Sequence, residues 1–354
     1  MTMLAAVLYG PRDLRVEQLP VPEPGAGEVR LRIAAASTCG TDVKVWRRGY
    51  HQNMIRPPAV LGHECAGVID AVGAGAAGWS PGTPVVAANS APCTRCYYCA
   101  KRLYSQCETL TYMNGAYAEY VIVPESIVRM NLLPLPIGLD PRFATLTEPL
   151  ACVVHGLQRC PVASGDEVVV LGSGPIGLFF VRLCVLAGAT VTALGRNAGR
   201  LETATRLGAT RVIEGDASDT GLQQQARATA NGGRGFDVVI ECIGVPAAWN
   251  AAVTLARRRG LVHLFGGCPR DTSVELATER IHYDELSITG TYHHTPEAIR
   301  EALDLIATGR IVPSEFLSGS IGIDDLPKAL ADLSEGAPFI KLSVLPPNAR
   351  LSGG

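Results

Sequence analysis

Short runs of hydrophobic residues alternate with polar ones over the first 150 residues, and glycine and proline bound most of these runs. Residues 28–35 alternate apolar and charged positions, and residues 66–72 form a second, largely apolar run. Runs of this length between turn residues are typical of β-strands. The pattern therefore predicts a mostly β domain over residues 1–150.

The pattern changes after residue 166. Residues 167–171 are apolar and mostly β-branched, as expected for a strand buried on both faces of a parallel sheet. Further strands are expected at 190–194, 236–242 and 260–267, and helices at 178–187, 198–207 and 247–257. Strands and helices in this order predict a doubly wound, α/β domain with a parallel sheet.

The C-terminal residues return to shorter elements. Thr295 followed by Pro296 predicts the start of a helix that runs to about Thr308. After it the sequence predicts alternating residues at 318–323, a short helix at 325–333, a strand-like run at 339–344 and a frayed polar tail at 346–354. We expect this C-terminal part to return to the first domain.

Length and charge narrow the class of protein. A chain of 354 residues exceeds the ~250 residues at which single cores stop growing, so two domains are expected. The 31 Lys and Arg nearly balance the 33 Asp and Glu, which gives a formal net charge of −2. This balance predicts no nucleic-acid or anionic-membrane partner and favours a small-molecule ligand.

The cellular compartment follows from the N-terminus and the cysteines. The N-terminal residues lack the basic segment of a secretion signal, and glycines, Pro175 and Arg182 interrupt the longest apolar stretch, residues 168–191. We therefore expect no membrane span and a cytoplasmic location. In a reducing cytosol the 11 cysteines are expected to be free thiols or metal ligands rather than disulfides.

Four cysteines lie close together within residues 90–110. Their spacing, Cys93, Cys96, Cys99 and then Cys107, can supply four thiolates to one metal ion. A closed tetrahedral shell of this kind is typical of structural zinc, which stabilises a polar loop that cannot bury a core of its own. An iron–sulfur cluster uses the same ligands, but nothing else in the sequence supports one.

A glycine-rich segment follows the first strand of the second domain and opens a helix. It reads Gly172-Ser173-Gly174-Pro175-Ile176-Gly177. In this context the backbone N–H groups and the helix N-terminus can hold the pyrophosphate of a dinucleotide. The alternative is a glycine-rich turn without a ligand.

The next strand ends in Gly195 and Arg196, where an NAD site usually places an acidic residue on the ribose 2′-hydroxyl. A glycine leaves room for a 2′-phosphate and an arginine can pair with it, so NADP(H) is preferred and NAD(H) is the alternative. Arg200 is a further candidate, unless it lies on a solvated helix face. Gly266, near the end of the expected strand 260–267, is also assigned to the coenzyme site.

A third group combines a thiol, an imidazole and a carboxylate among small residues. Cys39 lies in Ser37-Thr-Cys-Gly-Thr-Asp42, and His63 and Glu64 are adjacent within an apolar run. These are ligand types that zinc accepts. Each residue alone has a simpler interpretation, a core histidine or a small apolar cysteine; Cys65 is interpreted as packing.

The chain resembles the zinc-dependent medium-chain dehydrogenases over nearly its whole length. The resemblance rests on four features in this order: the Cys-Gly-Thr-Asp motif, the Gly-His-Glu motif, the four cysteines and the glycine-rich segment. The segment Glu148-Pro149-Leu150 makes the chain similar to the polyol (sorbitol-like) and threonine dehydrogenase branch of this superfamily. The resemblance implies a GroES-like β-barrel catalytic domain from residues 1–150 and 296–354, with a Rossmann domain at 151–295. It also implies a homo-oligomer, a tetramer or dimer.

The resemblance further implies roles for five residues. Cys39, His63 and Glu64 would hold a catalytic zinc, and Glu148 would bind the metal or its water. Thr41 would relay the substrate proton, although its hydroxyl could instead cap the following helix. Asp42 is expected to orient its neighbours rather than bind metal.

Departures from the family pattern limit the substrate. Lys44 stands where threonine dehydrogenases carry histidine, and residues 291–294 lack the arginine of animal sorbitol dehydrogenases. Threonine and sorbitol are therefore disfavoured. Tyr50, His51 and His293 are candidates for lining the substrate cleft, with surface loops as the alternative.

Taken together, these features predict an oxidoreductase with two zinc ions per chain, catalytic and structural. It would transfer hydride between NADP(H) and a secondary alcohol or ketone of a polyol, sugar or cyclitol. A simple alcohol or aldehyde reductase of the same superfamily is one alternative. A non-catalytic protein that binds NADPH or zinc is the alternative from a different class.

Overall fold

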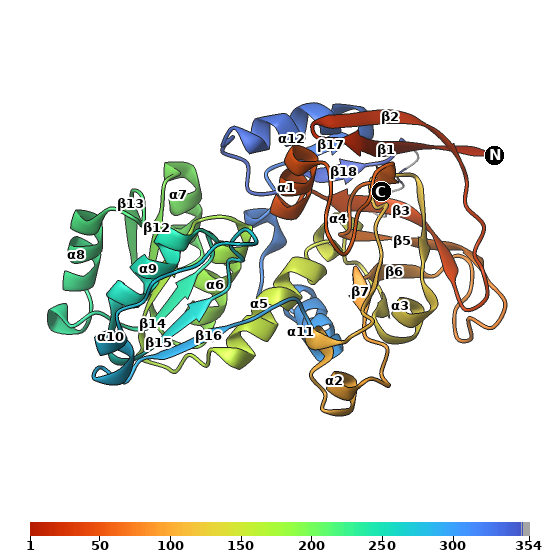
Figure 1. Ribbon diagram of the computed structural model, residues 1–354. Helices are drawn as coiled ribbons and strands as arrows, with labels where there is room; N and C mark the ends of the chain where they lie inside the picture. Colours follow the sequence, from red (N-terminus) through yellow and green to blue (C-terminus); the bar gives the residue numbers. More distant parts are fainter. Residues whose placement is uncertain (348, 350–354) are drawn as a thin grey trace. The chain divides into compact units, whose positions relative to one another are not determined.

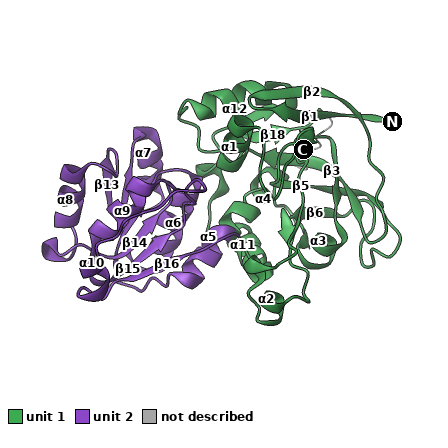
Figure 2. Ribbon diagram, in the orientation of Figure 1, with its two compact units in different colours: residues 1–151, 294–354 green, residues 152–293 purple. Residues whose placement is uncertain are grey.

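The computed structural model describes residues 1–347 and 349. Figure 2 shows two compact units: unit 1 joins residues 1–151 to residues 294–354, and unit 2 comprises residues 152–293. Most of the expected polar tail at 346–354 lies outside the described residues.

Unit 1 is rich in short strands, as the alternation in its sequence predicts (Figure 1). One sheet has the order β10-β6-β5-β3-β18-β17 with β9 also paired to β3, a second has the order β2-β1-β4, and β7 pairs with β8. The strands are β1 (Thr2–Gly10), β2 (Asp13–Pro20), β3 (Val29–Ser37), β4 (Ala59–Val60), β5 (Cys65–Val72), β6 (Pro84–Ala87), β7 (Ser90–Ala91), β8 (Thr111–Tyr112), β9 (Tyr120–Val123), β10 (Leu132–Pro134), β17 (Ser320–Gly322) and β18 (Ser343–Leu345).

The helices of unit 1 are mostly short. They are α1 (Gly40–Arg48), α2 (Tyr97–Ala100), α3 (Glu125–Met130), α4 (Pro141–Ala144), α11 (Pro296–Ala307) and α12 (Leu326–Ser334), with 3-10 turns η1 (Tyr104–Gln106), η3 (Pro313–Glu315) and η4 (Ile323–Asp325). Thr295 caps α11 by accepting a hydrogen bond from Ala298 N at 3.2 Å, as predicted. Helix α5 (Thr147–Arg159) begins in unit 1 and ends in unit 2.

Both ends of the chain build the core of unit 1. Leu31 and Ile33 of β3 belong to the same buried cluster as Leu330 of α12 and Val344 of β18. Strand β18 pairs antiparallel with β3, and Val344 lies opposite Ala36. Burying an aliphatic side chain of this size contributes about 1.5–3 kcal/mol, so the C-terminal strand and helix help to hold β3 in place.

Unit 2 is a doubly wound α/β domain, as predicted. Its six strands all pair in parallel in the order β13-β12-β11-β14-β15-β16 (Figure 1). Helix α6 packs against α7 and α8 against α9, as expected when helices cover both faces of such a sheet. The elements are β11 (Glu167–Leu171), α6 (Pro175–Leu186), β12 (Thr190–Gly195), α7 (Ala198–Arg206), β13 (Arg211–Glu214), α8 (Thr220–Ala228), η2 (Asn231–Gly233), β14 (Phe236–Glu241), α9 (Pro246–Leu255), β15 (Ala256–Leu264), α10 (Thr278–His282) and β16 (Ser287–Gly290).

One boundary in unit 2 differs from the sequence expectation. The helix expected at 247–257 ends at Leu255, and β15 begins directly at Ala256 rather than at residue 260. Ala256 lies opposite Phe236 of β14, and Arg257 donates from Nε to Asp237 Oδ1 at 2.6 Å. Pairing with the neighbouring strand thus overrides the helical pattern of the local sequence.

No helix within the described part of the chain has both the length and the hydropathy that crossing a membrane would require.

His263 lies in the core of unit 2, as predicted. Its side chain in β15 is fully buried, and its ring lies 6.2 Å from the rings of Phe180 and Phe265. Neither ring nitrogen has a hydrogen-bond partner among the described residues. Burial, together with the charges of His155 and Arg159, lowers the pKa of His263 to about 4. The imidazole is therefore neutral in the folded protein.

Replacing His263 by Leu should make unfolding less sensitive to acid. An unfolded histidine protonates near pH 6.5, whereas the folded one resists protonation down to about pH 4. Its contribution is present above pH ~6.5 and is lost as the pH falls towards ~4, by up to ~3 kcal/mol. Between about pH 7 and pH 4.5, the urea midpoint of H263L should fall less than that of the wild type. Exposed His282 supplies the control H282L, which should keep the wild-type dependence; parallel losses in H263L and wild type would contradict the prediction.

Candidate functional site

Cys39, His63 and Glu64 come together in unit 1. Their ligand atoms all lie within 4.8 Å of one another, with His63 and Glu64 buried and Cys39 partly exposed. Cys39 directly precedes α1, and Glu64 directly precedes β5. Strand β3 pairs with β5, and Ser37 N donates to Glu64 O at 3.1 Å. Sheet pairing therefore brings together two motifs that are separate in sequence.

Asp42 holds His63 in one orientation. Its Oδ1 lies 3.1 Å from His63 Nδ1, and its Oδ2 accepts from Cys39 N at 3.0 Å and from Tyr117 OH at 2.5 Å. Asp42 thus binds three neighbours and is not a member of the group of mutually close ligand atoms. This confirms the prediction that it orients residues. With Nδ1–H held by Asp42, Nε2 of His63 is the nitrogen left to bind a metal.

The pKa values of this pair are coupled in the metal-free protein. Burial disfavours the charged forms of both residues, but their mutual attraction outweighs it. The pKa of His63 is therefore well above its ordinary value, and the pKa of Asp42 is below its own. Burial, followed by the charge of Asp42, raises the pKa of Tyr117 well above its usual range, so this phenol donates as a neutral group.

Glu64 has two partners in addition to its place beside His63. Lys341 Nζ lies 2.6 Å from Glu64 Oε2 and donates to Oε1 at 2.9 Å, and Ser37 Oγ donates to Oε2. Lys341 is 1% exposed and Glu64 is fully buried. Burial lowers the pKa of Lys341, but the charge of Glu64 outweighs this effect, and the pKa is raised. Lys341 is therefore a permanent cation beside the site.

Glu148 lies near these residues but does not belong to the same group of ligand atoms. It is 6% exposed in the first turn of α5, and its Oε1 lies 3.9 Å from His294 Nε2. His294 Nε2 also lies 2.9 Å from Asn89 Oδ1. Burial raises the pKa of Glu148 to about 7, with His63 opposing this shift and Glu64 adding to it. The carboxyl group can thus gain or lose a proton near neutral pH.

Thr41 is the second residue of α1 and is partly exposed. The helix begins at Gly40 with Cys39 as its N-cap residue, so the alternative role of Thr41 as the cap is wrong. Lys44, three residues further along, is exposed. The predicted relay role of Thr41 stays a prediction.

The four clustered cysteines also converge. The sulfur atoms of Cys93, Cys96, Cys99 and Cys107 lie within 4.8 Å of one another. Two of the separations, Cys93 to Cys99 and Cys96 to Cys107, are 3.9 Å. Zinc–sulfur bonds of about 2.3 Å in a tetrahedron require sulfur atoms about 3.8 Å apart, so the residues fit this ion.

Hydrogen bonds within the same lobe favour a thiolate. The Thr109 hydroxyl, followed by the Arg95 backbone, lowers the pKa of Cys93 to about 6. Cys93 N donates to Cys107 Sγ at 3.2 Å. Burial instead raises the pKa of Cys99 to about 12. In a metal-free lobe these thiols would differ in charge, and a bound cation would stabilise all four as thiolates.

The glycine-rich segment lies between β11 and α6, at the carboxyl edge of the central strand. Gly172 has φ +104°, and Gly174 is the N-cap of α6, with Pro175 at the first helical position. A Cβ on Gly177 would lie 1.8 Å from Gly172 O. Only glycine allows the first turn of α6 to pack this closely on the loop. Ile176 is partly exposed in the same turn. This is the strand, loop and helix context that the dinucleotide prediction requires.

The end of β12 has no room for an acidic side chain and carries an exposed arginine. A Cβ on Gly195 would lie 2.4 Å from Ser173 Oγ, so an acidic side chain has no room there without movement. Arg196 is exposed, and its Nη1 lies 3.8 Å from Asp216 Oδ2. Arg200 is partly buried in α7, and burial lowers its pKa. Arg200 therefore does not lie on a fully solvated face of the helix, which is the alternative interpretation of this residue.

Gly266 lies where two loops touch. A Cβ on it would lie 2.4 Å from Gly244 N and 2.8 Å from Glu241 Oε2. Glu241 is fully buried and accepts from Ile243 N at 2.6 Å and Gly244 N at 2.8 Å, while Trp249 Nε1 donates to Gly266 O at 3.0 Å. These contacts account for a glycine at 266; its contact with a coenzyme stays a prediction.

The residues proposed for the substrate cleft have different surroundings. Tyr50 is 55% exposed. His51 is partly buried, and its Nδ1 accepts from Asn53 N at 3.3 Å. Burial and then the charge of His63 lower the pKa of His51, so its ring lies within electrostatic range of the candidate metal site. His293 has φ +61°, an uncommon conformation for a residue with a side chain.

Sequence reasoning missed Lys341, Ser37, Tyr117, Asn89 and His294 as neighbours of the site. One of them carried a usable signal. Lys341 is the only charged residue in an otherwise mostly apolar run, residues 339–345, and charged residues are rarely buried without a partner. The others are ordinary polar residues whose contacts depend on pairing between distant strands.

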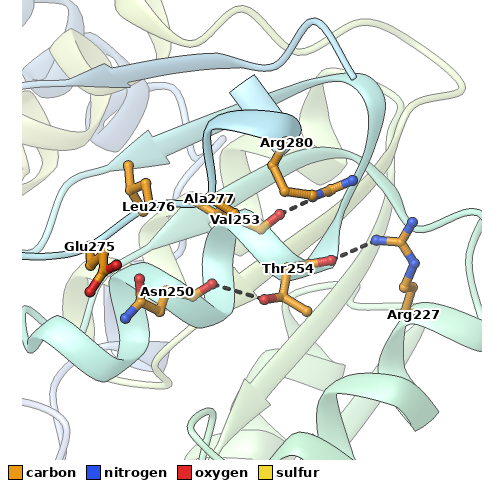
Figure 3. Close-up of a pocket in the computed structure, with 8 residues that line it drawn as sticks. All are labelled: Arg227, Asn250, Val253, Thr254, Glu275, Leu276, Ala277 and Arg280. Atoms are coloured by element: carbon orange, nitrogen blue, oxygen red, sulfur yellow. Dashed lines mark hydrogen bonds between the residues drawn. The ribbon is translucent and has the colours of Figure 1, made fainter. Parts of the chain in front are cut away.

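A hollow of about 470 Å³ in unit 2 contains none of the predicted site residues (Figure 3). It lies where α9 ends, and two arginines donate to the carbonyl groups of that helix end. Arg227 Nη1 bonds Thr254 O at 2.6 Å, and Arg280 Nη2 bonds Val253 O at 3.0 Å. The two arginine side chains thus donate to carbonyl groups at the C-terminal end of the helix.

Known families match both parts of the chain. Residues 25–136 match the alcohol dehydrogenase GroES-like domain, and residues 175–308 match the zinc-binding dehydrogenase family. The chain is 31% identical over 325 residues to L-galactonate-5-dehydrogenase of Escherichia coli K12, covering 90% of this chain and 91% of the relative. It is 29% identical over 344 residues to D-xylulose reductase A of Aspergillus oryzae, covering 94% of each.

Solved structures are similar over the same length. A structure described as a zinc-binding dehydrogenase of Sinorhizobium meliloti, bound to NADP, has a TM-score of 0.87 and 32% identity, and covers 98% of this chain and 100% of that one. Alcohol dehydrogenase from Thermus sp. ATN1 has a TM-score of 0.86 and 27% identity, with 97% and 99% covered. These similarities confirm the predicted GroES-like and Rossmann fold.

Replacing Asp42 by Asn should weaken zinc binding at the Cys39 group. An amide can donate to His63 Nδ1 and so favour the tautomer whose Nε2 carries a proton and cannot bind metal. We expect a 10- to 100-fold loss of zinc affinity, measured by competition with a chromophoric chelator. Asp70 in β5, which accepts from Arg30 Nε at 2.7 Å, gives the control D70N. Equal affinities for D42N and D70N would contradict the orienting role.

Proposed function

Because this chain belongs to the zinc-dependent medium-chain dehydrogenases, in their polyol dehydrogenase branch, we propose that it transfers hydride between NADP(H) and a secondary alcohol or ketone. The proposed substrate class is a polyol, sugar or cyclitol. The named relatives support it: L-galactonate-5-dehydrogenase and D-xylulose reductase A both act, by their names, on sugar-derived compounds.

The observation that carries this proposal is the convergence of Cys39, His63 and Glu64 within 4.8 Å. We take these three as the ligands of a catalytic zinc. Zinc held there would supply a Lewis acid with an open position, which lowers the pKa of a bound alcohol or water. The scaffold contributes the orientation of His63 by Asp42.

Two further side chains are proposed to handle protons. Glu148 has a pKa of about 7 in the metal-free protein, which suits exchange of a proton near neutral pH. Because its carboxylate is outside the group of mutually close ligand atoms, we propose that it acts through a water rather than as a metal ligand. Thr41 is partly exposed two residues after Cys39 and is proposed to relay the substrate proton.

A second zinc is proposed for the lobe at residues 90–110, held by Cys93, Cys96, Cys99 and Cys107. Its role would be structural, because four protein ligands leave no open position. The elements of the lobe, β7, α2 and η1, are all short, so a bound ion would stabilise a segment without a long helix or strand.

NADP(H) is the proposed coenzyme and is supported by the lack of room for an acidic side chain at Gly195, the exposed guanidinium of Arg196 and the NADP-bound relative. When bound it would supply the hydride acceptor or donor. Gly172, Gly174, Pro175, Ile176 and Gly177 would approach its pyrophosphate. Arg200 and Gly266 are proposed as further contacts. A homo-oligomer and a cytoplasmic location stay predictions.

A substrate panel tests the function. We expect turnover of polyols, sugars or cyclitols with NADP+, or of the matching ketones with NADPH, at the nicotinamide absorbance. The protein should hold two zinc ions per chain, and Cys39→Ser should lose one zinc together with turnover. C160S, at a buried thiol in unit 2, is the matched control that keeps both.

The same experiment separates the alternatives. Faster turnover of simple alcohols or aldehydes than of any polyol would favour the simple reductase. One zinc per chain and no turnover with any class would favour a non-catalytic binding protein.

Coenzyme choice gives a separate prediction. The wild type should favour NADP(H) over NAD(H) at least tenfold in kcat/KM, and R196A should reduce this preference at least tenfold through KM, because only NADP(H) has the 2′-phosphate. Arg258, an 85% exposed arginine of the same unit, supplies the control R258A. Wild-type preference for NAD(H) would contradict the assignment.

A further inference from the structure

Lys341 is a buried cation in contact with a proposed zinc ligand. Its side chain is 1% exposed, and its Nζ lies 2.6 Å from Glu64 Oε2 and 2.9 Å from Glu64 Oε1. Moving an ammonium group out of water costs several kcal/mol unless a close opposite charge compensates. Lys341 and Glu64 therefore depend on each other in the metal-free protein.

Lys341 is also fixed in position. The next residue, Leu342, donates from N to Thr38 Oγ1 at 3.0 Å and accepts at O from Thr38 N at 2.9 Å. Ser343 then lies opposite Ser37 in the pairing of β18 with β3. These bonds join the C-terminal segment to the two residues that precede Cys39. The ammonium group cannot move to solvent unless this pairing opens.

Both oxygens of the Glu64 carboxylate have partners without a metal. Lys341 contacts both of its oxygens, and Ser37 Oγ donates to Oε2. A cation bound at the Cys39, His63 and Glu64 group must share this carboxylate with a positive charge that is already present. Two cations on one carboxylate repel each other, most strongly where water is excluded.

We propose that Lys341 is a positioning residue of the metal centre: it takes the place of the zinc charge on Glu64 when metal is absent, and it weakens zinc binding when metal is present. This inference rests on the proposed function, because it takes Glu64 as a zinc ligand. It makes Lys341 the group that sets how readily the site exchanges metal.

Removing the charge of Lys341 has two effects, and both favour zinc binding. The site becomes more negative by one charge, which increases its attraction for a divalent cation. The metal-free protein also loses the partner of a buried carboxylate and becomes less stable, whereas bound zinc can compensate that carboxylate. Both effects increase the stabilisation that zinc provides.

The variant K341M tests this. Its zinc affinity at the site that C39S removes should be at least tenfold higher than in the wild type, measured by competition with a chromophoric chelator. Its Tm should fall in EDTA and rise more on zinc addition than the wild-type Tm does. Lys328, an 80% exposed lysine paired with Asp332 at 2.6 Å, gives the control K328M, which should match the wild type in both measurements.

A second variant covers the case in which K341M does not fold without metal. K341M/E64Q removes both charges, so its metal-free Tm should recover towards the wild-type value. If this double variant is as unstable in EDTA as K341M, Lys341 acts through packing alone and the inference is wrong.

The outcomes separate the two proposals. Zinc uptake at the Cys39 site with unchanged or weaker affinity in K341M would contradict the role of Lys341 and leave the proposed function standing. A wild type that takes up no zinc at that site would contradict the proposed function, and the role of Lys341 with it.

Discussion

The buried ion pair between Glu64 and Lys341 is the interaction on which the rest of the candidate metal site in unit 1 is built. Neither side chain can reach water, so removing one partner alone would destabilise the unit. The partners are 277 residues apart in sequence. Pairing them requires β18 to lie beside β3, and the same pairing holds Ser37 and Thr38, the two residues before Cys39. The stability of the fold and the geometry of the site are thus linked.

A second buried network lies beside this pair. Asp42 receives hydrogen bonds from Cys39 N and Tyr117 OH and holds Nδ1 of His63. Because Asp42 is itself fully buried, these bonds are needed to stabilise its charge. One nitrogen of His63 is thus held by the scaffold, and only the other is left for a metal.

Unit 2 depends on a different constraint. Its backbone segments must approach one another closely, whereas unit 1 must compensate buried charges. Gly177 allows α6 to begin against Gly172, and Gly195 leaves space for the hydroxyl of Ser173. A side chain at any of these positions would push apart elements that meet at the carboxyl edge of the sheet. The open coenzyme edge of a doubly wound sheet therefore depends on residues without side chains.

The sequence by itself determined much of this protein, because its strongest signals are local. The β-branched run before Gly172 and the capped start of α11 each predicted an element that the structure confirms. The four cysteines, whose spacing predicted a common metal site, converge. Periodicity also located most elements, but it misplaced the boundary between α9 and β15. There, the pairing of Ala256 with β14 decides the local structure.

Only the tertiary structure decided the neighbours of the candidate site. The motif residues Cys39, His63 and Glu64 were visible in the sequence, but Lys341 and Tyr117 were not assigned to them, because sequence distance carries no information about strand pairing. The role of Asp42 needed the contact with His63, and the separate position of Glu148 needed the start of α5. The sequence specifies the chemistry of each side chain. The packing of distant segments decides which buried charges compensate each other.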